Sequence, residues 1–231
     1  MIPLRTDQPR FSTAFVTGFL IAVNLLIYFA EFSLSPRAEM QLVYQFGLIP
    51  AHVIALLSGG RQMELAAALV PVVTSMFLHA SWMHVIGNMW FLWIFGGAIE
   101  DHLGHLQFLA FYLFSGVAAA LLQVILSPES RVPTVGASGA IAGVLGAFFL
   151  LYPKSRVLTW FPPIFLFYLP AWVMLGYWFV LQFIGGAVTA TTQASQMGGI
   201  AFWAHVGGFI AGILLVKVFP ERPRRYRYGA W

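Results

Sequence analysis

The sequence predicts an all-α membrane protein with six transmembrane helices, and three observations lead to this fold class. Only 9% of the 231 residues are charged, whereas 60% are hydrophobic, and the mean hydropathy is +0.82. A water-soluble domain carries about 25% charged residues because it needs a charged surface. Six apolar stretches follow one another along the chain, and a spanning helix needs about 20 such residues. We place them at 13–30, 83–99, 106–126, 138–152, 164–185 and 199–219.

The first stretch, 13–30, is longer than the apolar core of a secretory signal peptide, and no A-x-A-like cleavage site follows it. We therefore expect a helix there. The long segment 31–82 is broken by Ser58-Gly59-Gly60-Arg61, so we expect short helices in the outer membrane interface rather than a span. The segment 185–198 is rich in Gly, Thr, Gln and Ser, which predicts a mobile cap on the same side.

The basic residues set the expected orientation. Six spans place both termini on one side, and that side collects 9 of the 12 Lys and Arg residues, leaving Arg37, Arg61 and Arg131 outside. The positive-inside rule then puts both termini in the cytoplasm. We expect a cytoplasmic segment at 1–12, a single membrane domain at 13–219 and a basic tail at 220–231 that contacts anionic lipid rather than nucleic acid. The expected location is a bacterial inner membrane.

Several site chemistries are excluded or disfavoured by residue types that are absent. The chain has no cysteine, which excludes disulfides, thiolate metal sites and a cysteine nucleophile. It has no H-E-x-x-H motif and no Asp within a predicted span, so neither a zinc nor a paired-aspartate intramembrane protease fits. The cluster Glu100-Asp101-His102 with His105 falls between spans two and three. We interpret it as a solvated loop, with metal binding as a weaker alternative.

Polar groups inside a membrane span are costly, so each is a candidate functional residue. The motif Gly136-Ala137-Ser138-Gly139 opens the fourth span. Ser138 could simply cap that helix, with the glycines allowing close packing. It could also be a nucleophile at a helix N-terminus, where free backbone N–H groups bind a developing oxyanion.

Histidines supply the other polar groups. His205 lies well inside the sixth span, either as a core histidine bonded to a backbone carbonyl or as a general base. His84 and Asn88 share one helix face at i, i+4 spacing, either as a packing pair or as hydrogen-bond donors to a reacting group. We interpret His79, just upstream, as a structural residue that bonds the outer loop.

Depth and packing indicate that these groups meet. At 1.5 Å per residue, Ser138, Asn88 and His205 all lie about 8–10 Å inside the outer surface. Glycines spaced along the fourth and sixth helices would let the two backbones approach closely, which brings Ser138 within reach of His205. These glycines are Gly139, Gly143, Gly146, Gly208 and Gly212.

The chemistry that follows is a Ser–His dyad, since no acidic residue is available at this depth to complete a triad. His205 would take the Ser138 proton and later return it to the leaving amine. His84, Asn88 and the Ser138 backbone N–H would bind the oxyanion.

The three motifs His84-x-x-x-Asn88, Gly136-x-Ser138-Gly139 and Ala204-His205-x-x-Gly208-x-x-x-Gly212 occur in order on helices two, four and six. Together they resemble the rhomboid family of intramembrane serine proteases, over about residues 13–219. The resemblance implies a six-helix bundle that cleaves single-pass membrane proteins near the outer end of their transmembrane segment. It also implies no cofactor, a dyad and oxyanion donors at the matching positions, and a structural role for His79.

Two positions depart from the family pattern. A Trp-Arg pair often found in the first loop is replaced by Leu69-Val70-Pro71, and a Tyr that stacks on the catalytic histidine in some members is replaced by Ala142. His205 must therefore be held by other contacts. Two alternatives remain: a non-catalytic rhomboid-like protein that binds membrane clients for turnover, and a small transporter with His84 and His205 in a proton path.

Overall fold

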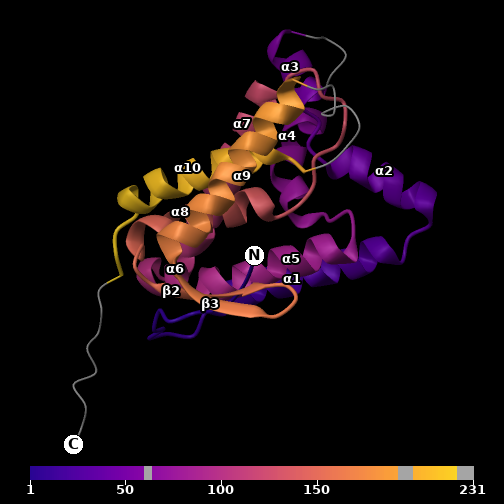
Figure 1. The fold of residues 1–231 in the computed structure, drawn as a ribbon. Helices are drawn as coiled ribbons and strands as arrows, with labels where there is room; N and C mark the ends of the chain where they lie inside the picture. The colour runs from indigo at the N-terminus through magenta and orange to yellow at the C-terminus, as the bar shows by residue number, and fades with distance from the viewer. Residues whose placement is uncertain (60–63, 192–199, 223–231) are drawn as a thin grey trace, which may run out of the picture.

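The computed structural model describes residues 1–59, 64–191 and 200–222, and these form a mostly helical bundle (Figure 1). In chain order the helices are α1 Phe15–Phe32, α2 Pro36–Phe46, α3 Pro50–Leu57, α4 Leu65–Thr74, the 3₁₀ turn η1 Ser75–Phe77, α5 Trp82–Phe91, the π-helical η2 Leu92–Gly96, α6 Gly97–Leu103, α7 His105–Leu126, α8 Ser138–Leu151, α9 Ala171–Thr191 and α10 Phe202–Val218.

Four helical segments are long and apolar enough to cross a membrane: Phe15–Phe32, Trp82–Leu103, His105–Leu126 and Ala171–Ala190. Helices α8 and α10 are apolar but shorter. Five of the six expected stretches agree with observed helices to within four residues at each end. Of the expected cap at 185–198, residues 185–191 instead continue α9, while 192–199 lie outside the described residues, as do 60–63 and most of the basic tail.

The fifth stretch is where the all-α prediction is wrong. Residues expected to start a helix at 164 form strand β3 (Phe165–Pro170), which pairs antiparallel with β2 (Arg156–Phe161). Strand β1 (Ile2–Thr6) pairs with the other edge of β2, giving the order β1-β2-β3. Aromatic residues favour strands, and Pro170 removes a backbone donor just before the helix, so α9 begins at Ala171. The first residues of the chain therefore belong to a sheet.

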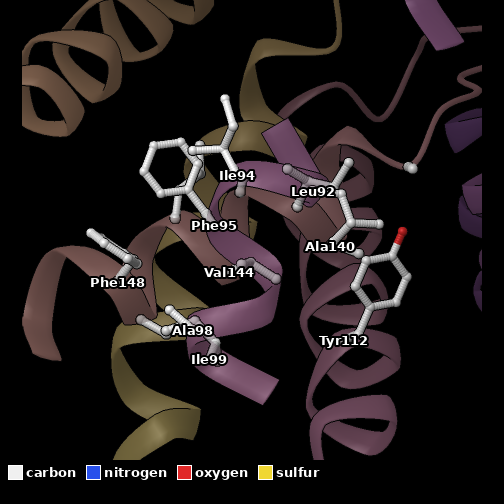
Figure 2. Close-up of a cluster of buried hydrophobic side chains, with 14 of the residues drawn as sticks. Leu92, Ile94, Phe95, Ala98, Ile99, Tyr112, Ala140, Val144 and Phe148 are labelled. Carbon is white, nitrogen blue, oxygen red and sulfur yellow. The ribbon is translucent and has the colours of Figure 1, made fainter. Parts of the chain in front are cut away.

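The core surrounds α8, whose residues are buried almost throughout because α7, α9, α10 and the α5–α6 segment pack around it. Figure 2 shows side chains from η2 and α6 meeting those of α7 and α8. Phe95 and Phe148 meet edge to face with ring centroids 5.0 Å apart. A helix of 14 residues can therefore sit at the centre of the bundle without contacting lipid along most of its length.

Glu100 is completely buried, so its interpretation as part of a solvated loop is wrong. Its carboxylate accepts hydrogen bonds from the backbone N–H groups of Val16 and Thr17, each at 2.8 Å, and from the Thr17 hydroxyl at 2.7 Å. His105 Nδ1 lies 2.6 Å from Glu100 Oε1. The cluster satisfies the free amides at the start of α1 and places a negative charge at the positive end of the helix.

Candidate active site

Ser138 and His205 are in hydrogen-bond contact. The Ser138 Oγ lies 2.7 Å from His205 Nε2, although 67 residues separate them along the chain. Ser138 is the first residue of α8, and its hydroxyl is directed to the histidine rather than capping the helix, whose N-cap is Ala137. His205 lies in the first turn of α10 and is buried. The arrangement joins a hydroxyl nucleophile to a base.

Close packing of α8 on α10 produces this contact. A Cβ atom on Gly208 would collide with the Gly139 carbonyl oxygen, and one on Gly212 would collide with the Gly143 carbonyl oxygen. Gly143 also faces Ser115 of α7. The glycines thus let the two backbones touch, and any larger side chain would push His205 away from Ser138.

His84 and Asn88 face the segment that precedes Ser138. A Cβ on Gly136 would lie 2.7 Å from the His84 ring and 3.5 Å from Asn88 Nδ2. Gly136 has φ +127°, a conformation that residues with a side chain rarely adopt. The Asn88 amide nitrogen is buried and has no hydrogen-bond partner among the described residues. The Asn88 amide N–H is therefore a free hydrogen-bond donor close to the N-terminus of α8.

The loop 127–137 is held by the segment between α1 and α5. Leu48 and Thr134 exchange backbone hydrogen bonds at 3.0 and 2.7 Å, and the Gly136 N–H donates to the Ser75 carbonyl at 2.8 Å. The Thr74 hydroxyl ties α4 to the Phe46 carbonyl at 2.8 Å. These contacts hold the first loop although the Trp-Arg pair is absent.

His79 lies between η1 and α5, only 2% exposed. Its backbone N–H donates to Glu31 Oε2 at 3.2 Å, and its ring lies 5.1 Å from the His84 ring, centroid to centroid. Burial, and to a smaller extent the neighbouring His84, together lower the pKa of His79 to about 3. The ring is therefore neutral at ordinary pH and packs between the loop and the His84 side chain.

Three residues around His205 were not anticipated from the sequence. Gln182 Oε1 lies 2.7 Å from His205 Nδ1, and the Trp178 ring lies 5.7 Å from the His205 ring. Gln123 Oε1 accepts the Ala204 N–H at 3.1 Å, at the start of α10. Ala142 is buried and faces Gly208, and the aromatic ring beside the histidine is that of Trp178 of α9. A polar residue in a span, such as Gln182, was the available signal.

Chemically, the site places a hydroxyl, an imidazole and several N–H donors around one point. Ser138 can attack a carbonyl carbon while His205 accepts its proton. The first amides of α8, which have no partner within the helix, and Asn88 can donate to the oxygen that becomes negative. Among the described residues, no three His, Cys, Asp or Glu side chains gather to hold a metal ion. His105 Nδ1 contacts Glu100 Oε1 at 2.6 Å, and His102 Nδ1 lies 3.6 Å from Glu221 Oε1.

Comparison with known proteins supplies independent information. A sequence model described as the Rhomboid domain matches residues 66–222. Rhomboid protein 1, mitochondrial, of Saccharomyces cerevisiae is 31% identical over 176 residues, which is 73% of this chain and 48% of that protein. Rhomboid-like protein 11, chloroplastic, of Arabidopsis thaliana is 28% identical over 229 residues, covering 95% of this chain and 69% of that protein.

The human presenilin-associated rhomboid-like protein, mitochondrial, is 32% identical over 154 residues, or 63% of this chain and 37% of that protein. The chain thus spans about half or less of several of the curated relatives it matches. Their names place these relatives in mitochondria and chloroplasts, so the expectation of a bacterial inner membrane finds no support in them.

Proposed function

The chain belongs to the rhomboid family of integral membrane proteins, and on that premise we propose that it is an intramembrane serine endopeptidase. Its substrates would be single-pass membrane proteins, cut near the outer end of their transmembrane segment. The observation that supports this most is the 2.7 Å contact between Ser138 Oγ and His205 Nε2, which is the geometry of an activated nucleophile.

In the proposed mechanism His205 removes the Ser138 proton as the hydroxyl attacks the scissile carbonyl. The oxyanion that forms is bound by the Asn88 amide, the His84 ring and the Ser138 N–H. His205 then protonates the leaving amine, and a water molecule hydrolyses the acyl-enzyme by the same steps in reverse roles. All the groups are neutral at rest, which suits a site below the membrane surface because burying unpaired charge is costly.

The proposed topology has six spans, with α8 and α10 as short central spans in addition to the four long ones. The membrane domain would cover 13–219, with residues 1–12 and 220–231 on the cytoplasmic, basic side. Helices α2, α3 and α4 would lie in the outer interface. Substrate would enter beside α9, whose exposed face carries Tyr177 and Phe183.

The test is cleavage of a single-pass membrane protein in liposomes by the parent protein and by Ser138→Ala. The variant should insert and fold normally but lose all cleavage, since no other nucleophile replaces the hydroxyl. Equal cleavage by both proteins would refute the mechanism. A different result would favour a non-catalytic client-binding role: neither protein cleaves any of a panel of transmembrane substrates, but the parent still binds some of them.

A further inference from the structure

Helix α9 contacts the base through two residues one helical turn apart. Trp178 and Gln182 stand at i, i+4 spacing and so share one face of the helix. The Trp178 ring lies against the His205 ring at an interplanar angle of 34°, and Gln182 reaches its Nδ1. Helix α9 contacts α10, which carries His205, and the two cross at an angle in Figure 1. The His205 ring is thereby contacted on its face by Trp178 and at Nδ1 by Gln182.

The hydrogen bond to Gln182 determines which ring nitrogen of His205 can act as a base. For Nε2 to accept the Ser138 proton it must be unprotonated, so the single proton of the neutral ring has to be on Nδ1. A proton on buried Nδ1 needs an acceptor, and Gln182 Oε1 lies 2.7 Å away. An amide nitrogen at that position would instead donate to Nδ1 and leave the proton on Nε2, where it blocks the reaction.

We propose that Gln182 is the positioning residue of the dyad: it holds His205 in the Nδ1–H tautomer with Nε2 directed at Ser138. The inference rests on the proposed protease function and extends it, since the dyad then has a neutral third member. Gln182 serves the orienting role that a carboxylate has in a Ser-His-Asp triad, without a buried charge. Gln182 is on α9 and His205 is on α10, so the ability of His205 to accept the Ser138 proton depends on how α9 packs on α10. Helix α9 also borders the proposed entry path.

The experiment measures the rate constant and the final extent of Ser138 labelling by a fluorophosphonate probe, together with kcat and KM for a transmembrane substrate. Gln182→Met keeps the length and removes the acceptor, Gln182→Asn keeps the amide but shortens its reach, and Gln182→Glu keeps an acceptor oxygen. Thr189→Val is the control, because Thr189 is a polar residue of α9 whose hydroxyl donates to the Gly186 carbonyl of its own helix.

Gln182→Met and Gln182→Asn should lower both the labelling rate constant and kcat by about 10- to 100-fold, a typical cost of losing an orienting partner, with KM nearly unchanged. Gln182→Glu should stay within about 3-fold of the parent, and Thr189→Val should match it. A merely structural role would lower the extent of labelling and leave the rate constant intact.

Two results would overturn the inference: an unchanged rate constant in Gln182→Met, or equal losses in Gln182→Met and Gln182→Glu. Failure of the proposed function itself looks different. In that case Ser138→Ala is labelled as well as the parent, whatever the residue at 182.

Discussion

Two clusters of buried polar side chains lie in this bundle, one around Glu100 and one around Ser138, and they differ in how fully they are paired. Both carboxylate oxygens of Glu100 accept hydrogen bonds, from the start of α1 and from His105. In the second cluster the Asn88 amide nitrogen is buried without a partner among the described residues. An unpaired buried donor costs about 1–3 kcal/mol, so the fold tolerates it only where packing compensates.

The Glu100 cluster should contribute mainly to stability, and the Ser138 cluster mainly to function. A fully paired buried cluster holds elements together, and its loss should appear as unfolding. An incompletely paired one is held in place by its surroundings, and its free groups are available to a substrate or a transition state. Substitutions in the two clusters should therefore have effects of different kinds.

The largest effect in this comparison is expected from Asn88→Leu. The substitution keeps a similar volume and removes the unpaired donor, so transition-state stabilisation is lost while a desolvation cost disappears. We expect kcat to fall by about 10²- to 10³-fold, as for other oxyanion donors. Thermal stability should be unchanged or slightly higher. Kinetics with a transmembrane substrate and a melting curve check both; a large loss of stability with normal kcat would contradict the assignment.

Gly136→Ala should have the next largest effect on catalysis. Its Cβ would lie 2.7 Å from the His84 ring at a φ of +127°, so either the ring or the loop must move. Displacing these groups by about 1 Å costs up to about 100-fold in kcat. The control is Gly87→Ala, because nothing lies within 4 Å of a Cβ at that position. Equal kcat in the two variants would argue against a role for the close approach.

Glu100→Gln tests the paired cluster. One carboxylate oxygen becomes an NH₂ donor facing N–H groups of α1, so at least one bond turns repulsive. We expect the free energy of unfolding to fall by about 2–4 kcal/mol, while the labelling rate constant of folded protein stays normal. Glu129→Gln, at an exposed position, is the control. A lower labelling rate constant with unchanged stability would reverse the distinction between the clusters.

The smallest effect concerns pH and His79. An unfolded histidine binds a proton below about pH 6.5, whereas the buried ring does so only near pH 3. Between these values the unfolded state binds more protons, so stability falls as pH is lowered from about 6.5 toward 3. His79→Gln lacks this contribution and should lose less stability between pH 7 and 4.5 in melting experiments. Glu31 and His84, which face His79, are present in both proteins; parallel curves would contradict the prediction.

The helices and part of the candidate site could be predicted because they leave a local pattern in the sequence. Apolar runs located five of the six stretches, because a membrane helix needs a continuous apolar segment. The i, i+4 spacing of His84 and Asn88 and the glycine stripe of α8 are local patterns that placed side chains on helix faces. Since α8 packs on α10 through these glycines, the position of Ser138 beside His205 followed from the sequence pattern.

What could not be predicted depends on contacts between distant segments. Glu100 reaches α1 across 84 residues, and nothing near it in the sequence marks it as a buried cap. Gln182 contacts His205 only because α9 packs on α10 with one particular rotation. The β1–β2 pairing joins the first residues to a segment about 150 residues later, and long-range strand pairing leaves no periodic signal in an apolar run.

The central claim, that Ser138 is a nucleophile activated by His205, is tested most directly with an active-site probe. A fluorophosphonate should label the parent protein at Ser138, identified by mass spectrometry of the peptide. Ser138→Ala should show no labelling, and His205→Ala should be labelled at least about 10²-fold more slowly, because general-base catalysis is lost. Labelling of the parent at another residue, or equal rates in the parent and in His205→Ala, would contradict the account.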